Sequence, residues 1–153
     1  ALNDSMTGFY NRNAYDYFIY NEKNIKNYMV VTFDLNNLKM CNDNYGHSSG
    51  DAYIIHSAHI IETTFDRFGK CYRIGGDEFC CLIPDAAEFQ IERFIQKMQQ
   101  DIAILNNKNI IPTEVGIACG YALATPDDAD IEKVRERADE MMYHNKKVLK
   151  GLI

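Results

Sequence analysis

Apolar residues recur along the chain in two ways, as short runs typical of strands and as longer stretches typical of helices. The short runs are bounded by turn-forming residues and rich in β-branched and aromatic side chains, so they indicate strands. The predicted strands cover residues 28–35, 70–74, 79–83 and 114–123. The first is nearly continuous in apolar character, which predicts a buried strand.

Helices are predicted between these strands. They cover about 11–22, 37–45, 50–65, a segment after Asp85 with apolar positions from Ile91 to Leu105, and a segment after Asp128 with apolar positions from Ile131 to Met142. Gly46 is expected to end the second helix and Asp85 to cap the fourth. The stripes expected inside include Ile54, Ile55, Ala58, Ile61 and Phe65 in the third helix, and Met141 and Met142 in the last. This order predicts an α/β (α+β) fold, a mostly antiparallel central sheet flanked by helices.

The stretch Arg73-Ile74-Gly75-Gly76-Asp77-Glu78-Phe79 lies between two predicted strands and is the most distinctive in the chain. Apolar runs separated by Gly-Gly-Asp-Glu are typical of a β-hairpin with a tight turn. Glycine permits a positive φ and lets the backbone approach a ligand, while adjacent carboxylates can hold a hard cation. The pattern predicts a phosphate-and-metal site at the tip of a hairpin.

The composition is that of one globular domain over residues 1–153, since 46% of the residues are hydrophobic and 25% are charged. No run approaches the ~18 apolar residues of a membrane span and no signal peptide opens the sequence, so we expect no direct membrane contact by this domain. The net charge of −6 argues against a nucleic-acid binder, which needs a basic face. A polyanionic ligand must therefore be met by local cations or by a metal.

The five cysteines are odd in number and contain no Cys-x-x-Cys pair. We expect free thiols in a reducing cytoplasmic location rather than disulfides or a zinc site. Cys80 and Cys81 are neighbours on a predicted strand, so their side chains should point to opposite faces.

Asp34 lies at the carboxyl end of the first predicted strand, where strand ends open onto crevices. Alone it would more often cap the following helix, but Asp77 on a neighbouring hairpin favours a binding site. Carboxylates completed by phosphate oxygens suit Mg²⁺, which takes few protein ligands. An EF-hand is excluded, because Lys39 stands where that loop requires glycine.

The stretch 73–79 resembles the signature of the GGDEF family, the diguanylate cyclases. Further blocks that resemble this family are Asp4–Arg12, Phe33–Asp43, Gly46–Asp51 and Ala138–Tyr143 followed by Lys146. They occur in family order and span nearly the whole chain. The resemblance implies a nucleotide-cyclase-like fold with a ferredoxin-like core, a sheet of about five strands, and the GGDEF β-hairpin.

The activity implied by the resemblance is condensation of two GTP into cyclic di-GMP with release of two pyrophosphates. The implied catalytic residues are Asp34, Asp77 and Glu78. The implied metal ligands for Mg²⁺ or Mn²⁺ are Asp34, the carbonyl of Leu35 and Asp77. Glu78 is either a further ligand or helps to activate the attacking hydroxyl.

The resemblance also implies a substrate site for GTP. Asn42 and Asp51 match guanine contacts, and a carboxylate that accepts from the guanine edge rejects adenine. Taken singly, each could instead cap a helix. The implied phosphate contacts are Lys39, Lys146, Lys150, Gly75 and Gly76, and Asn37, Leu38 and His47 complete the implied substrate-binding set. The alternative for the two C-terminal lysines is an ordinary solvated cluster favoured by the helix dipole.

The chain departs from the family pattern at a few positions. Asn36 replaces the second Asp of Asp-x-Asp, and Lys150 replaces an Arg, so that a bidentate fork becomes a point charge. The usual product-inhibition pair Arg-x-x-Asp is matched by Asp66 and Gly69, with Arg67 one place out of register. We therefore expect no high-affinity product inhibition through these positions.

The resemblance implies a two-fold homodimer, because each protomer offers one GTP half-site. The single domain 1–153 is expected to be the C-terminal output part of a longer signalling protein with an upstream sensory or dimerising region. The alternative from another class is a GTP-binding regulatory module with little turnover. A purely structural interaction domain would leave the clustered acids and glycines unexplained.

Overall fold

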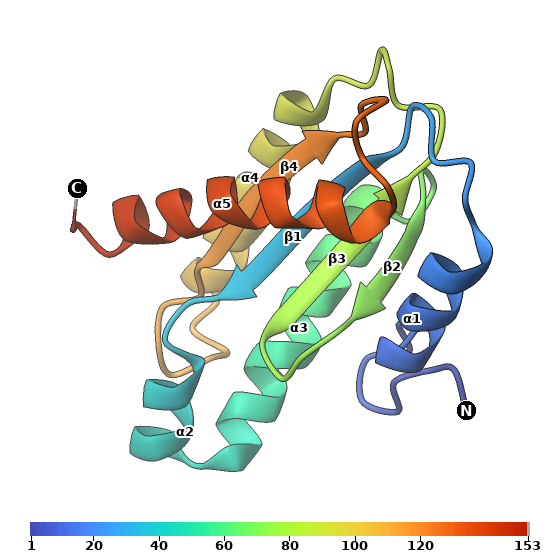
Figure 1. Cartoon of the computed structure of the whole chain (residues 1–153). Coiled ribbons are helices and arrows are strands. Elements are labelled where there is room, and N and C mark those ends of the chain that lie inside the picture. Colours follow the sequence, from blue (N-terminus) through green and yellow to red (C-terminus); the bar gives the residue numbers. More distant parts are fainter. Residues whose placement is uncertain (153) are drawn as a thin grey trace.

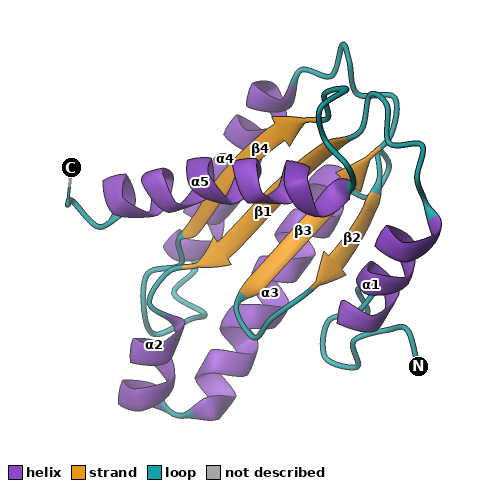
Figure 2. Ribbon diagram, viewed as in Figure 1, coloured by secondary structure: helices purple, strands orange, loops and turns teal. Residues whose placement is uncertain are grey.

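The computed structural model describes residues 1–152 as a four-stranded sheet with helices on both faces (Figures 1 and 2). The elements in chain order are α1 (Arg12–Asn21), β1 (Met29–Leu35), α2 (Leu38–Tyr45), α3 (His47–Phe65), β2 (Lys70–Arg73), β3 (Glu78–Ile83), α4 (Ile91–Asn107), β4 (Ile117–Leu123) and α5 (Ile131–Leu149). The predicted order of helices and strands is confirmed. No helix in residues 1–152 is both long and apolar enough to cross a bilayer.

The strands lie in the order β2-β3-β1-β4, and every neighbouring pair is antiparallel. This is the β-α-β-β-α-β arrangement of a ferredoxin-like core, so the predicted fold class is confirmed. The described sheet has four strands rather than about five. Beside the outer strand β2, Tyr10 forms only isolated bridges to Asn3 and Tyr72, so no further strand develops at that edge.

Helices α3 and α4 cover one face of the sheet and α5 crosses the other, while α1 lies beside β2 (Figures 1 and 2). Successive residues of β1 point to opposite faces. Its odd-numbered side chains, such as Phe33, join the core formed with α3 and α4. On the opposite face, Val30 joins a second, smaller core with residues of α1 and α5.

Helix α3 begins at His47, earlier than the expected start near Gly50. Gly46 has a φ of 92° and therefore ends α2 and precedes α3 at one sharp bend. The burial predicted for Ile55 and Met141 is wrong, because these side chains are 46% and 40% exposed at the edges of their helical stripes.

The expected cap of the fourth helix is also wrong. Asp85 has a φ of 52° in the loop after β3, and the residue before α4 is Gln90. In contrast, α1 and α5 begin with side-chain caps. Asn11 accepts a hydrogen bond from the N–H of Ala14, and Asp130 accepts one from the N–H of Lys133.

Candidate active site

The carboxyl end of β1 and the tip of the β2–β3 hairpin form one acidic corner of the sheet. Asp34 on β1 pairs in register with Glu78 on β3. The N–H of Leu35 donates to the carbonyl of Asp77 at 3.0 Å. The pairing of a central strand with the hairpin thus brings Asp34, Asp77 and Glu78 together from distant parts of the sequence.

Asp34 is a buried carboxylate with one oxygen bound and one free. The side chain is 7% exposed, and its Oδ2 accepts a hydrogen bond from Lys146 Nζ of α5 at 2.9 Å. Its Oδ1 is buried and contacts no hydrogen-bond donor within residues 1–152. Burial raises the pKa of Asp34, and the negative charges of Asp77 and Glu78 raise it further, against the opposing effect of Lys146.

Burial by itself would lower the pKa of Lys146, but the hydrogen bond to Asp34 and the charges of Asp34 and Asp77 raise it overall. A corner that gathers this much negative charge favours a cation. Lys146 compensates only part of this negative charge, since the second oxygen of Asp34 has no hydrogen-bond donor within residues 1–152.

The hairpin turn is held by the carbonyl of Glu78, which accepts from the N–H groups of Ile74 at 3.0 Å and Gly75 at 3.3 Å. Glycine permits a positive φ, but neither Gly75 nor Gly76 has one in this turn. The glycines instead provide room. A Cβ on Gly75 would lie 3.3 Å from Glu78 Cβ, and a Cβ on Gly76 would enter open space.

Arg73 stabilises the turn through side-chain hydrogen bonds that were not predicted from the sequence. Its guanidinium donates to the carbonyl of Gly76 at 2.8 Å and to both carboxylate oxygens of Asp4 at 3.2 Å. Asp4 is held in turn by the N–H and hydroxyl of Thr7, at 2.9 and 2.7 Å. Burial would raise the pKa of Asp4, but the bonds from Thr7 and Arg73 lower it overall. Arg73 and Asp4 both belong to sequence blocks that resemble the family, and this was the sign in the sequence that pointed to them.

A second missed contact fixes the end of β1 from the opposite face. The buried hydroxyl of Tyr53 on α3 donates to the carbonyl of Asn36 at 2.6 Å. It also lies 3.1 Å from the carbonyl of Gly116 and accepts from the N–H of Gly116 at 3.0 Å. Tyr53 therefore ties the chain after β1 to the chain before β4. Nothing in the apolar pattern distinguishes this hydroxyl from a core aromatic ring.

Asn42 and Asp51 lie at the junction of α2 and α3. A Cβ on Gly50 would lie 1.7 Å from Asn42 Oδ1, so only glycine at position 50 lets the Asn42 amide lie against α3. Asp51 follows directly and is exposed. The sharp bend at Gly46 brings the two helices together at this point.

Of the other residues predicted to bind the substrate, the structure shows only some in contact with the acidic corner. Of the three lysines, Lys146 reaches Asp34, whereas Lys39 is 90% exposed in its side chain and pairs with Asp43 at 2.9 Å. Lys150 is exposed and follows the last residue of α5. At the start of α2, Asn37 is exposed with a φ of 60° and Leu38 is buried, while His47 is exposed at the start of α3.

The donor set fits a hard divalent cation. No group of three or more His, Cys, Asp or Glu side chains in the described part of the chain is already arranged around a metal position. The free Oδ1 of Asp34, the neighbouring Asp77 and Glu78 and the carbonyl of Leu35 nevertheless supply oxygens at one corner. These residues could hold a cation once a ligand completed the coordination shell.

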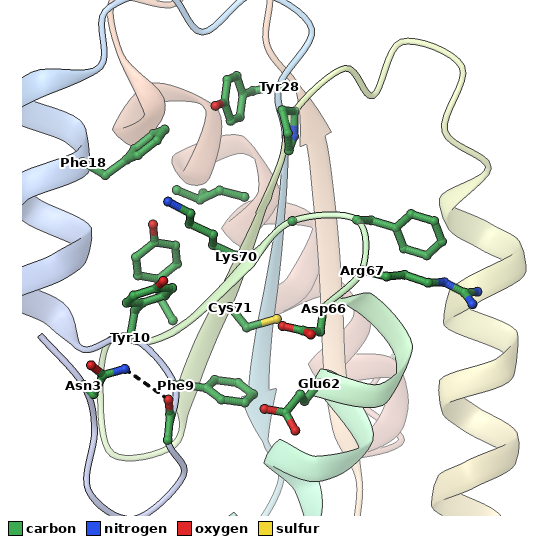
Figure 3. Close-up of a pocket in the computed structure, with 16 residues that line it drawn as sticks. Asn3, Phe9, Tyr10, Phe18, Tyr28, Glu62, Asp66, Arg67, Lys70 and Cys71 are labelled. Atoms are coloured by element: carbon green, nitrogen blue, oxygen red, sulfur yellow. Dashed lines mark hydrogen bonds between the residues drawn. The ribbon is translucent and has the colours of Figure 1, made fainter.

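A separate hollow of about 550 Å³ lies between the outer edge of β2, α1 and the turn after α3 (Figure 3). Asp66, Arg67 and Gly69, which occupy the product-inhibition positions, line it. Arg67 points toward α4, with its guanidinium 4.7 Å from the Phe68 ring (Figure 3). A Cβ on Gly69 would lie 2.1 Å from the carbonyl of Leu82, so the family's aspartate does not fit this backbone.

Comparison with known sequences gives a family and relatives. The family "Diguanylate cyclase, GGDEF domain" matches residues 1–150. Diguanylate cyclase DgcN of Escherichia coli (strain K12) is 31% identical over 152 residues, and diguanylate cyclase DgcS of Shewanella oneidensis is 27% identical over 155 residues. Both alignments cover 95% of this chain, but only 37% of DgcN and 50% of DgcS. The chain thus spans half or less of these relatives.

Comparison with solved structures gives the same fold. The GGDEF domain of DgcB from Caulobacter crescentus, solved in complex with c-di-GMP, has a TM-score of 0.82 at 24% identity, covering 96% of this chain and 91% of that one. The FimX GGDEF domain from Pseudomonas aeruginosa has a TM-score of 0.79 at 18% identity, covering 96% and 94%. The family match extends over nearly the whole sequence, and this chain therefore belongs to the diguanylate cyclase GGDEF domains.

Proposed function

We propose that this domain is an active diguanylate cyclase that condenses two GTP molecules into cyclic di-GMP and releases two pyrophosphates. The observation that carries the proposal is the acidic corner. Asp34 keeps a buried, unbonded carboxylate oxygen next to Asp77 and Glu78, beside a glycine turn with open space at Gly76. A structural carboxylate would be expected to have both oxygens satisfied.

The residues proposed to hold the cation, Mg²⁺ or Mn²⁺, are Asp34, the carbonyl of Leu35, Asp77 and Glu78. When bound, the cation neutralises charge on the phosphate under attack. The backbone of Gly75 and Gly76 gives the triphosphate room to approach. Lys146, which is bonded to Asp34, would be free to contact the phosphates if a cation took its place there, and Lys150 and Lys39 would add positive charge.

Guanine is proposed to lie at the α2–α3 junction, against Asn42 and Asp51. The exposed Asp51 carboxylate can accept hydrogen bonds from the N1–H and N2–H₂ groups of guanine, whereas adenine offers no such pair. Leaving each of these groups unpaired costs about 1–3 kcal/mol. The domain is therefore expected to prefer GTP to ATP.

Turnover is proposed to need a two-fold dimer, because the attacking 3′-hydroxyl of one nucleotide must reach the α-phosphate of the other. The curated relatives are longer than this chain, which supports a role as one domain of a larger signalling protein. The displaced Arg67 and the blocked position of Gly69 support weak or absent product inhibition.

The proposal is tested by incubating the domain with GTP and Mg²⁺ over a range of protein concentrations and separating the products by chromatography. Cyclic di-GMP is expected, with a specific activity that rises with protein concentration. Asp77→Asn should abolish it. A second candidate, a GTP-binding regulatory module, is favoured by the pairing of the exposed Lys39 with Asp43 rather than with a residue of the acidic corner. Tight GTP binding without product at the highest concentration would favour that candidate.

A further inference from the structure

Two thiols face each other across the hairpin that carries the acidic corner. Cys71 on β2 and Cys81 on β3 are in register, and their Sγ atoms are 3.0 Å apart. Both are free cysteines in the same apolar core, between the sheet and α3 and α4. Neither residue has a place in the proposed reaction.

The strand pairing gives these cysteines the geometry that a disulfide needs. The N–H of Ile74 donates to the carbonyl of Glu78, so these two residues form a hydrogen-bonded pair. Opposed pairs along an antiparallel ladder alternate between hydrogen-bonded and non-hydrogen-bonded, and three pairs further along Cys71 faces Cys81 at a non-hydrogen-bonded position. The carbonyl of Cys71 points outward, where it accepts from the N–H of Tyr10. At such positions the Cα atoms lie about 4.5 Å apart, inside the range of about 4.4–6.8 Å that a disulfide spans.

The two thiols differ in access. Cys71 is 5% exposed and lines the hollow beside β2, whereas Cys81 is completely buried (Figure 3). Burial raises the pKa of Cys81, which favours its protonated form. A small oxidant can therefore reach Cys71 first.

We propose that Cys71 and Cys81 form a redox-active dithiol, which a small peroxide oxidises to a disulfide across β2 and β3. Hydrogen peroxide transfers one oxygen to the Cys71 sulfur, giving a sulfenic acid and water. The Cys81 sulfur then attacks the Cys71 sulfur, and the hydroxyl leaves with the Cys81 proton as a second water. The two thiols lose two electrons and two protons in total, and the peroxide accepts them.

The bond would close a loop that contains the candidate metal-site turn. Cys71 lies two residues before Arg73, which holds the carbonyl of Gly76, and Cys81 lies three residues after Glu78. A covalent tie at the base of this short hairpin restricts the separation of its strands. The alternative is that both thiols only fill the core as small apolar side chains.

The test uses the full chain, reduced, freed of reductant and exposed to hydrogen peroxide. Thiols are then counted under denaturing conditions, and the linked peptides are mapped by mass spectrometry. We expect the count to fall from five to three, with a Cys71–Cys81 peptide and full recovery after dithiothreitol. Five remaining thiols, or a bond that involves any other cysteine, would overturn the proposal.

Cys80 provides a matched control, because it is completely buried on the same strand but belongs to the core on the opposite face. Cys80→Ser should still lose two thiols to peroxide, whereas Cys71→Ala and Cys81→Ala should not form the bond. Peptide mapping of the unmutated chain does not depend on whether a variant folds. Oxidation should also slow hydrogen exchange at the amides of Gly75 and Glu78, and unchanged exchange there would remove the link to the turn.

Discussion

The two faces of β1 serve different purposes. The odd-numbered side chains, Met29, Val31, Phe33 and Leu35, are all buried in the core with α3 and α4. The even-numbered side chains, Val30, Thr32 and Asp34, are just as buried, but only the first is apolar. Along the same strand, one face is uniformly apolar and the other becomes polar toward the candidate active site.

The difference has an energetic meaning. On this second face the Oδ1 of Asp34 is buried and has no hydrogen-bond partner within residues 1–152. Such an atom costs about 1–3 kcal/mol when it remains unsatisfied. The apolar face toward α3 and α4 stabilises the fold, while the face toward α5 carries Asp34, which we propose to bind a cation.

The largest effect is expected from Asp34→Asn. The amide oxygen can still accept from Lys146, so we expect the free energy of unfolding to stay within about 1 kcal/mol of the wild type. Loss of the charge should lower cyclic di-GMP formation by about 10³-fold, because a bound cation contributes several kcal/mol. Activity is measured by chromatography and stability by urea unfolding.

Asp16→Asn is the matched control, since Asp16 is an exposed carboxylate paired with Arg12 on α1. It should change neither quantity measurably. Near-normal turnover by Asp34→Asn would contradict the assignment of this corner as the metal site.

Phe33→Ala tests the opposite face of the same strand. The Phe33 ring is 1% exposed and lies 5.5 Å from the Phe65 ring, centroid to centroid. Its truncation is expected to lower the free energy of unfolding by about 3–5 kcal/mol, through lost burial and a cavity. The fraction that remains folded should retain most of its activity. Unfolding in urea gives the first quantity, and a loss below 1 kcal/mol would contradict the division between the faces.

Tyr53→Phe removes a hydroxyl that joins the apolar core to the polar strand end. The carbonyl of Asn36 and the N–H of Gly116 would lose their partner, at about 1–3 kcal/mol of unfolding free energy. Because these groups follow β1 and precede β4, the apparent affinity for Mg²⁺ should also fall. The free energy of unfolding and the apparent Mg²⁺ affinity are both measured. If the hydroxyl has a purely structural role, the stability alone will change.

Sequence patterns predict the apolar half of this comparison well. The short runs locate the four strands, because buried strands are rich in apolar and β-branched residues. They also predict that Asp34 lies at the carboxyl end of β1 and that Asp77 and Glu78 lie at the hairpin turn, and the register of Asp34 with Glu78 agrees with this. The individual roles of the site residues stay predictions.

Contacts between residues far apart in the sequence could not be predicted from its patterns. The bond between Lys146 and Asp34 joins residues 112 positions apart, and Tyr53 reaches Gly116 across 63. Such pairs depend on how helices cross the sheet, which a periodic pattern does not encode. The turn glycines show the converse problem, because their role is space around the backbone rather than an unusual φ.

Lys146→Met should separate cation binding from nucleotide binding. Without the ammonium group, both oxygens of Asp34 are open to a cation, so nucleotide-free Mn²⁺ affinity should rise by about tenfold, or about 1.4 kcal/mol. GTP affinity should fall, because a phosphate contact is lost. Calorimetric titration measures both, and the exposed neighbour Lys147 provides the control Lys147→Met. Unchanged Mn²⁺ affinity would contradict a competition between lysine and metal.

The smallest effect is expected at the other end of α5, where both carboxylate oxygens of Glu132 have hydrogen-bond donors. Glu132 accepts from the Tyr15 hydroxyl and from Arg135, whose Nε lies 2.6 Å and Nη2 3.0 Å away. Burial would raise the pKa of Glu132, but these bonds lower it below its usual 4.5. The folded state therefore binds this proton less readily than the unfolded state, and the resulting stability is present above about pH 4.5 and lost as the pH falls through the lowered value.

Urea midpoints of the wild type and Glu132→Gln should accordingly differ near about pH 6 and converge toward about pH 3. The difference should be modest, because the group is partly exposed and screened by solvent. Glu136→Gln is the control, since Glu136 forms an exposed pair with Lys133 at 3.6 Å. A constant difference across this range would mean that Glu132 contributes through packing rather than charge, and that the contrast between the two ends of α5 is not electrostatic.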